Sequence, residues 1–333
     1  MLRRDLLKTA GAAALGMTLS GALPATAQES VKVRFGYIPD DAVGSLVAIA
    51  NANSLWAKYG LEAQLVSFTN GPSQVVAMEA GSLDAGFVGP GAMWLPPAGR
   101  AKVIGINILD FANVVLGQPG IGTDVSALKG KTVGVTEGTS GEMILLQALG
   151  KAGMTVDDIQ KVNLDPATLV PAFITGQVDA AAIWYPPAAT ILQNQPEAVT
   201  LASDAAFYPE LAPVSAFLAS KEAVAANREG LVRLMAVLSE AMDIRYNDVP
   251  AAAKLTTAIT GLDADTVFST LGSDKVKLFK TAELVDATEK GLVYNWLNAR
   301  NDLFLKLGKI ETAIPAEEYY EAQIFLDGAA LVK

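Results

Sequence analysis

Ala77-x3-Gly81-x2-Asp84-Ala85 occurs early in the chain and continues into Gly86-Phe87-Val88-Gly89. A second copy begins 95 residues later, reads Ala172-x3-Gly176-x2-Asp179-Ala180 and continues into Ala181-Ala182-Ile183-Trp184. The pattern predicts a helix that ends on a glycine with positive φ, then a tight turn and a buried strand. Two copies favour two similar α/β lobes with a ligand cleft between them. A single large α/β domain with recurrent helix–turn–strand units is the alternative.

Strand and helix patterns alternate around both copies. Around the first copy, strands are expected at Val31–Tyr37, 61–68 and Ala85–Val88, with helices at 42–57 and 74–80. A further strand is expected at 103–109. Around the second copy the order repeats, with strands at Thr132–Val135, 159–164 and Ala180–Trp184 and helices at 142–151 and 169–175. This alternation predicts parallel sheets with helices on both faces.

The rest of the chain is expected to return to the first lobe and to be mainly helical. A strand is predicted at 213–219, followed by helices at Arg228–Asn247, 251–259, 263–271 and 281–307. We therefore expect an α/β fold in which two mainly parallel sheets are flanked by helices. Lobe 1 would contain residues 28–112 and 217–333, and lobe 2 residues 113–216. The chain would cross the hinge twice, near 111–116 and 211–219.

Residues 1–27 have the pattern of an export signal. Arg3-Arg4-Asp5-Leu6-Leu7-Lys8 is a twin-arginine sequence, a mild apolar stretch follows, and Ala25-Thr26-Ala27 is a small-x-small cleavage site. The apolar stretch is short and contains Gly, Ser and Thr, so it is a poor membrane span. Cleavage after Ala27 would leave 306 of the 333 residues in a periplasmic protein, and an uncleaved N-terminal anchor is the alternative.

The composition excludes several classes of function. The chain contains no cysteine and no histidine, which removes disulfides, thiol nucleophiles, thiolate metal sites and the commonest general base. The formal net charge is −10, and it would become −12 after loss of Arg3, Arg4, Asp5 and Lys8 with the signal. An acidic surface argues against binding to nucleic acid or to an anionic membrane. Ligand binding without a cofactor or metal is therefore favoured over catalysis.

The sequence contains only a fragment of a phosphate-binding motif. Gly130-Lys131-Thr132 resembles the end of a phosphate-binding loop, but the position five residues before Gly130 is Val125, and the segment leads into a strand. No zinc or EF-hand spacing is present. The motifs therefore give no nucleotide or metal site.

Polar residues follow the predicted strands of lobe 1, at the sheet edge where open α/β folds bind ligands. Asp40 and Asp41 follow the first strand, and their carboxylates would face a ligand amine or else cap the next helix. Thr69, Asn70 and Ser73 follow the second strand. They would offer hydroxyl and amide donors to a polar ligand, or else form a capped turn around Gly71-Pro72.

In lobe 2 the loop around Gly138 and Gly141 is the strongest candidate. It contains Glu137, Thr139, Ser140 and Glu142, of which Glu137, Thr139 and Ser140 are the candidate ligand residues. Its glycines allow close approach of the backbone to a ligand, and its hydroxyls stand at a predicted helix N-terminus. A plain helix cap is the alternative.

Three aromatic residues and one glycine complete the candidate site. Trp184 and Tyr185 end the strand of the second copy, and Gly89 and Trp94 follow the strand of the first. Aromatic rings at the rim of a cleft would stack on a ligand or face a cation, or else pack in the core or hinge.

Together these segments resemble the periplasmic substrate-binding proteins of the nitrate, taurine and aliphatic-sulfonate ABC importers, a family that also includes binders of thiamine precursors. The resemblance covers nearly all of the chain after the signal. It rests on three segments, which are 69–89, Leu128-Lys129-Gly130-Lys131-Thr132-Val133-Gly134-Val135, and 173–186. It implies a type II periplasmic-binding-protein fold, a monomer whose two lobes close on a small solute and deliver it to an ABC permease and its ATPase. By position, it implies ligand loops at 40–41, 69–73, 89–94, 136–140 and 184–185.

The candidate loops contain no arginine or lysine, so a fully anionic ligand would depend on hydroxyls and backbone N–H groups alone. With Asp40, Asp41 and Glu137 nearby, we expect an amine-bearing or zwitterionic solute, such as the aminosulfonate taurine. The alternatives are an alkyl sulfonate, or a pyrimidine or other nitrogen-rich cation. Thiamine-precursor enzymes of this superfamily rely on His and Cys, which are absent here, so a lyase or synthase on the same fold is the less favoured class.

Overall fold

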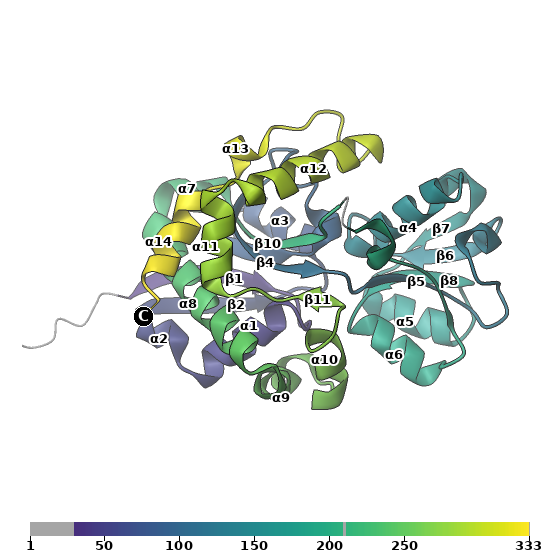
Figure 1. Ribbon diagram of the computed structural model, residues 1–333, viewed down its shortest axis with the longest axis horizontal. Coiled ribbons are helices and arrows are strands. Elements are labelled where there is room, and N and C mark those ends of the chain that lie inside the picture. Colours follow the sequence, from purple (N-terminus) through teal and green to yellow (C-terminus); the bar gives the residue numbers. More distant parts are fainter. Residues whose placement is uncertain (1–29, 209–210, 333) are drawn as a thin grey trace, which may run out of the picture.

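The computed structural model describes residues 30–208 and 211–332, and it has two lobes, each built around its own sheet (Figure 1). The predicted export signal at 1–27 lies outside the described residues. Within the described part, the sheet of lobe 1 has six strands in the order β11-β4-β10-β3-β1-β2. Their bounds are β1 Val31–Tyr37, β2 Leu61–Ser67, β3 Ala85–Val88, β4 Lys102–Asp110, β10 Val214–Ala219 and β11 Val276–Lys277.

The sheet of lobe 2 repeats much of this plan. Within the described residues it has five strands in the order β7-β6-β8-β5-β9. Their bounds are β5 Asn113–Gly117, β6 Thr132–Val135, β7 Gln160–Asn163, β8 Ala180–Trp184 and β9 Val199–Ser203. The predicted two-lobed α/β fold is confirmed.

Each sheet is mainly parallel but contains an inserted antiparallel strand, which the alternation of strands and helices did not predict, and lobe 1 adds the short antiparallel edge strand β11 beside β4. In lobe 1, β10 lies antiparallel between β3 and β4, while β1 pairs in parallel with β2 and β3. In lobe 2, β5 lies antiparallel between β8 and β9, while β6 pairs in parallel with β7 and β8. Both inserted strands directly follow a crossing from the other lobe, so they enter their sheets from the hinge side.

The repeated phrase forms the same structure in both lobes. Gly81 and Gly176 have φ of +69° and +72°, so each glycine ends its helix in the left-handed region, as predicted. The N–H of Ser82 then bonds the carbonyl of Ala77 at 2.9 Å, and in lobe 2 the N–H of Gln177 bonds that of Ala172 at 2.8 Å. The helix of each copy therefore ends in the same way, one helix in each lobe.

The aspartate of each copy fixes the neighbouring strand. Asp84 accepts a hydrogen bond from the N–H of Arg34 at 2.7 Å, and Asp179 accepts one from the N–H of Thr132 at 2.8 Å. Asp84 also pairs with the Arg34 guanidinium. The function of both aspartates is therefore structural, and neither lines the cavity between the lobes.

Helices cover both sheets, and most agree with the predicted segments. Their bounds are α1 Val43–Ala52, α2 Leu55–Lys58, α3 Gly71–Glu79, α4 Ser140–Lys151, α5 Pro166–Ile174, α6 Pro187–Asn194, α7 Lys221–Ala226, α8 Arg228–Asn247, α9 Val249–Thr260, α10 Ala264–Leu271, α11 Thr281–Glu289, α12 Leu292–Lys306, α13 Ala316–Tyr319 and α14 Ala322–Ala330. Two expected helices are each broken in two. Ser54, with φ of +53°, separates α1 from α2, and Gly291, with φ of +78°, separates α11 from α12. A left-handed residue cannot continue a right-handed helix.

Two short crossings join the lobes. Phe111 and Ala112 link β4 to β5, and the second crossing leads from a short 3-10 turn at Asp204–Phe207 to β10. The rings of Phe111 and Tyr208 meet edge to face, with centroids 5.1 Å apart, so the two crossings pack against each other. All of β10 belongs to the sheet of lobe 1, and the boundary predicted between residues 216 and 217 falls inside this strand.

Candidate functional site

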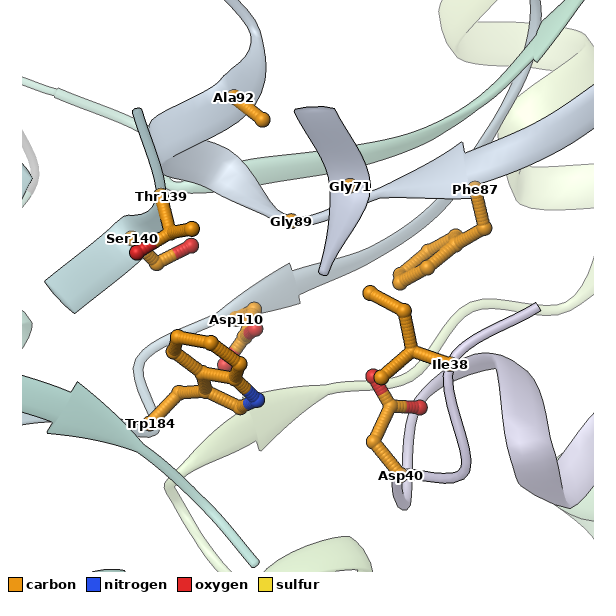
Figure 2. Close-up of a pocket in the computed structure, with 10 residues that line it drawn as sticks. All are labelled: Ile38, Asp40, Gly71, Phe87, Gly89, Ala92, Asp110, Thr139, Ser140 and Trp184. Carbon is orange, nitrogen blue, oxygen red and sulfur yellow. The ribbon is translucent and has the colours of Figure 1, made fainter. Parts of the chain in front are cut away.

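The candidate site is a cavity between the two lobes, at the carboxyl ends of their strands. Lobe 1 lines it with Ile38 and Asp40 after β1, Gly71 at the start of α3, and Phe87 and Gly89 around the end of β3. Thr139 and Ser140 at the start of α4 and Trp184 at the end of β8 line it from lobe 2 (Figure 2). This is the edge at which the sequence placed the ligand.

Asp40 caps the helix that follows it, and its side chain also lines the cavity. Its Oδ1 accepts hydrogen bonds from the N–H groups of Val43 and Gly44 at 2.9 and 3.4 Å, so it caps the first turn of α1. The side chain also lines the cavity, although Asp40 is only 6% exposed. Within the described residues Oδ2 of Asp40 accepts no hydrogen bond.

Asp110 is a second carboxylate in the cavity, and the sequence analysis missed it. It ends β4 where the chain leaves lobe 1, and its Oδ1 accepts a hydrogen bond from the N–H of Ala112 at 2.9 Å. It lines the same cavity as Asp40. The available signal was an acidic residue at the carboxyl end of a strand next to a predicted crossing.

Burial raises the pKa values of the two carboxylates in the cavity, Asp40 and Asp110. Loss of water raises the pKa of Asp40 to about 7, against the effect of its bonds to α1, and Asp41 and Asp110 raise it further by charge repulsion. Burial likewise raises the pKa of Asp110 to about 6. Neither the inner cavity nor the adjoining one is lined by a lysine or arginine among the described residues. The lining is therefore acidic, and the buried guanidinium of Arg245, which interacts with Asp40 by charge, lies outside it.

Asp41 and Asp204 are buried near the same point but do not line the cavity. Asp41 is 3% exposed, and Thr270 lies beside its carboxylate and opposes the effect of burial on its pKa. Burial raises its pKa to about 7. Asp204 accepts a hydrogen bond from Asn113 at 2.5 Å, which joins the lobe 2 ends of the two crossings, and burial raises its pKa to about 8. Both are further buried carboxyl groups on the hinge side, and the charge of buried Arg300 acts on Asp204.

The loop of lobe 2 that we ranked highest meets lobe 1 directly. Ser140 and Thr139 line the cavity, and Oγ of Ser140 accepts a hydrogen bond from the N–H of Gly91 at 3.1 Å. Gly89, also predicted, lies so close to Ser140 that a Cβ there would be 2.8 Å from its Oγ. These contacts show that the lobes are closed on each other at this end of the cavity.

Glu137 does not face the cavity, because its side chain forms an ion pair with Lys161 at 2.8 Å and is 49% exposed. The buried acid of this loop is Glu142, which the sequence analysis placed in the loop but did not select. Its carboxylate bonds the N–H of Gly138 at 2.7 Å and pairs with Lys161 of lobe 2 and Lys309 of lobe 1. Glu142 therefore holds the candidate loop in place within lobe 2 and also joins it to lobe 1.

The aromatic candidates have different positions. Trp184 lines both the inner cavity and the adjoining one, and it is 9% exposed. Trp94 lines neither, and its Nε1 donates a hydrogen bond to the carbonyl of Gly138 at 3.2 Å, which joins the lobes. Tyr185 lies outside the cavity, with Lys275 of lobe 1 at 5.4 Å from its ring centroid.

Of the three candidates after β2, Asn70 and Ser73 form the capped turn, which was the alternative to ligand binding. Oδ1 of Asn70 accepts a hydrogen bond from the N–H of Ser73 at 3.0 Å and caps α3. Oγ of Ser73 bonds the carbonyl of Asn70 at 2.9 Å. Only Thr69 of this group lines the adjoining cavity. The structure thus brings together Asp40, Thr69, Gly89, Thr139, Ser140 and Trp184, and it leaves Asp41, Asn70, Ser73, Trp94, Glu137 and Tyr185 outside the lining.

Residues 26–260 match the model of the NMT1-like family. The chain belongs to the NMT1-like family. A relative from Brucella abortus (strain 2308), named only as a binding protein, is 42% identical over 304 residues, which cover 91% of this chain and 94% of that protein. The family resemblance stated from the sequence is confirmed.

Solved structures of binding proteins are similar to this NMT1-like chain along most of its length. The alkanesulfonate-binding protein SsuA from Xanthomonas axonopodis pv. citri, bound to MOPS, is 26% identical with a TM-score of 0.71, and the match covers 89% of this chain and 100% of that one. The desulfurization enzyme DSZB has a TM-score of 0.62 at 14% identity, with 90% of this chain and 99% of that one covered. The second similarity concerns the fold alone.

Metal-binding clusters and membrane-spanning helices are both absent from the described residues of the NMT1-like chain. No group of three or more acidic side chains there is arranged to hold a metal ion. No helix among residues 30–208 and 211–332 combines the length and the apolar composition of a membrane span.

Proposed function

We propose that this NMT1-like protein is the extracytoplasmic solute-binding component of an ABC importer, and that its two lobes close on a small organic solute that carries an amine. Relatives named as binding proteins and the two-lobed fold support the first part of the proposal. The twin-arginine pattern at 3–8 supports export to the periplasm. A permease and its ATPase would be the protein partners of a monomer.

One observation favours an amine as the ligand. Asp40 and Asp110 line a cavity whose lining contains no lysine or arginine among the described residues, and Arg245 reaches Asp40 by charge only from outside that lining. A buried charge is costly unless it is paired. An ammonium group placed between the carboxylates would bring a positive charge into the cavity itself and would donate up to three hydrogen bonds.

A sulfonate alone fits this cavity poorly, although sulfonate binding is named for the structural relative SsuA. A sulfonate placed against Asp40 and Asp110 would add negative charge to a site that already disfavours it. A zwitterion such as taurine would place its ammonium in the cavity, and its sulfonate would have to lie elsewhere.

Closure would follow from a shift in population. The ligand would touch Asp40 and Asp110 on the lobe 1 side and Ser140 and Trp184 on the lobe 2 side. Because only the closed form presents both sets of groups together, the ligand binds that form better and increases its population. The permease would then recognise the closed form.

We infer binding and not catalysis, although an enzyme of similar fold is known. The described residues that line the cavity offer only Asp, Thr and Ser side chains as reactive groups, and no base is hydrogen-bonded to Ser140 or Thr139. A nucleophile without such a base is weak. Recovery of unchanged amine after prolonged incubation with the purified protein is the expected result.

Calorimetry with primary amines tests the proposal. Asp40→Asn and Asp110→Asn keep the backbone bonds to α1 and to Ala112 but remove the negative charge. We expect amine affinity to fall about 10- to 100-fold in each, because hydrogen bonds to charged groups contribute about 1.5–3 kcal/mol. Asp265→Asn, at an exposed position of α10, is the matched control and should bind normally. The proposal fails if ethanesulfonate binds tightly and no amine does.

A further inference from the structure

The space between the lobes consists of two adjoining chambers. The inner chamber contains Asp40, Asp110 and Ser140, and the outer chamber opens from it towards α5 and α6. Ile38, Asp40 and Trp184 line both, so a ligand can extend from one into the other. Figure 2 shows the indole nitrogen of Trp184 pointing to the side of the cavity on which Asp40 lies.

The inner chamber is very small. Its cavity volume is about 20 Å³, which is enough for one water molecule or a group of similar size. A primary ammonium has this size. A sulfonate, with four heavy atoms, or a trimethylammonium group would need the closed lobes to separate.

The carboxylates of the inner chamber have acceptors left for such a group. Asp40 uses Oδ1 to cap α1, and Asp110 uses Oδ1 to bind the N–H of Ala112. Within the described residues Oδ2 of neither aspartate accepts a hydrogen bond, and Asp40 is only 6% exposed. The edge of the chamber includes the ring of Trp184, whose face attracts cations.

The outer chamber has a different chemical character. Its volume is about 260 Å³, and its lining is mostly apolar, with Phe68, Pro166, Pro186 and Pro187 among the lining residues. The polar side chains in it are Asp40, Ser67 and Thr69, and no lysine or arginine among the described residues reaches it. It would accept a hydrocarbon group, and it offers no cation to a sulfonate or carboxylate.

We infer that the ligand is a primary amine with a compact apolar body, an alkyl or aryl amine, whose ammonium enters the inner chamber between Asp40 and Asp110 and whose body fills the outer chamber. This inference rests on the proposed function, which requires an amine but not a particular body. It makes the outer chamber the determinant of specificity, because that chamber distinguishes a hydrocarbon body from an anionic one.

Calorimetry with a matched set of compounds tests this inference. 2-Phenylethylamine and 3-methylbutylamine have both features. Ethylamine has the ammonium group but no large apolar body, and taurine has a sulfonate in place of that body. 2-Phenylethanesulfonate has the apolar body but a sulfonate in place of the ammonium group. Trimethyl(2-phenylethyl)ammonium has the same body and a larger cationic group. We expect the two apolar amines to bind about tenfold or more tightly than each of the other compounds, since every other compound loses one of the two chambers.

The outcomes separate this inference from the proposed function. If ethylamine or taurine binds as tightly as both apolar amines, the ligand does not need an apolar body, but the proposal that it is an amine stands. If 2-phenylethanesulfonate binds most tightly, both the inference of an apolar amine and the proposed amine function are wrong. If the trimethylammonium compound matches its primary amine, the size argument for the inner chamber is wrong. If no compound binds, the inference is overturned.

A substitution in the outer chamber gives a second test. Ala167, an exposed residue in the first turn of α5, lines this chamber. Ala167→Arg would add a cation there, and Ala167→Met would add similar bulk without charge. Relative to Ala167→Met, we expect Ala167→Arg to improve the ratio of taurine to 3-methylbutylamine affinity about tenfold. An unchanged ratio in folded variants would contradict the assignment of the outer chamber.

Discussion

The backbone N–H of Gly91 in lobe 1 donates a hydrogen bond to Oγ of Ser140 in lobe 2, with 3.1 Å between the two atoms. A Cβ on Gly91 would lie 2.2 Å from the carbonyl oxygen of Thr139 and 2.3 Å from the backbone nitrogen of Ser140. The closed form thus depends on a glycine at this position. The same glycine carries no strain in lobe 1 itself, since its φ is not positive.

Gly91→Ala should therefore prevent full closure without unfolding either lobe. Contacts this short cannot be relieved by a side-chain rotation, because the opposing atoms belong to the backbone. We expect amine affinity to fall about 10-fold or more, with a larger radius of gyration in the presence of ligand. Calorimetry and solution X-ray scattering measure the two effects.

Gly150→Ala is the control for this substitution. Gly150 lies within α4, and a Cβ there would meet nothing within 4 Å. This variant should keep wild-type affinity and gain up to about 1 kcal/mol of stability, since alanine is the better helix former. Normal ligand affinity in Gly91→Ala would contradict the closed geometry.

Ser140→Ala tests the other side of the same contact. Removal of Oγ leaves the N–H of Gly91 buried without a partner in the closed form, while in an open form water can bind it. An unpaired buried donor costs about 1–3 kcal/mol, so affinity should fall about 5- to 100-fold. The melting temperature of the ligand-free protein should change little. A variant that binds amine normally would remove Ser140 from the closing contact.

Much of this arrangement could be predicted from local sequence. The glycines and aspartates of the two copies determine helix ends and strand clamps through bonds to nearby residues, so β1, β3, β6 and β8 have their predicted bounds. The break between α1 and α2 was not predictable in this way. Ser54 adopts a left-handed conformation without being glycine, and nothing in the local pattern marks it.

The site was less predictable because it depends on contacts distant in sequence. Glu137 and Glu142 both belong to the candidate loop, but only Glu142 turns inward, where it meets Lys309, 167 residues away. Asp110 lines the cavity because the crossing after β4 brings it beside the loop of Asp40. Such proximities arise from the hinge, and a pattern of neighbouring residues does not contain them.

The ion pair between Glu142 and Lys309 predicts a further effect on closure. Burial opposes the charge of Glu142, but hydrogen bonds from Lys309, the N–H of Gly138 and Lys161 keep its pKa below the ordinary value. Lys309→Met removes the only one of these partners that lies in lobe 1. Since hydrogen bonds to charged groups contribute about 1.5–3 kcal/mol and Lys309 is partly exposed, we expect amine affinity to fall about 5- to 30-fold.

Lys161→Met provides the matched control, because Lys161 pairs with Glu142 within lobe 2. It should lower the stability of lobe 2, measured by thermal unfolding, but change amine affinity less than about threefold. If both lysine variants lower affinity equally, the bond across the lobes has no special role in closure.

Amine affinity should increase with pH between about 5 and 7.5. Asp40 and Asp110 have pKa values raised by burial to about 7 and about 6, so both are largely protonated at pH 5. An amine, which stays protonated throughout, pairs with the ionised carboxylates and displaces their protons. Titrations in buffers of different ionisation enthalpy should detect this proton release, and it should decrease in Asp40→Asn.

The stability of the ligand-free protein should change in the opposite direction. Because these pKa values are higher in the folded protein than in the unfolded chain, the folded state binds more protons between about pH 4 and 7. Their contribution to stability is complete below pH 4 and is lost as the pH rises through 6 and 7. Ligand-free stability should therefore fall over the range in which amine binding strengthens, and Asp40→Asn should flatten both slopes. Amine affinity that is constant from pH 5 to 7.5 would mean that the ammonium does not meet these carboxylates.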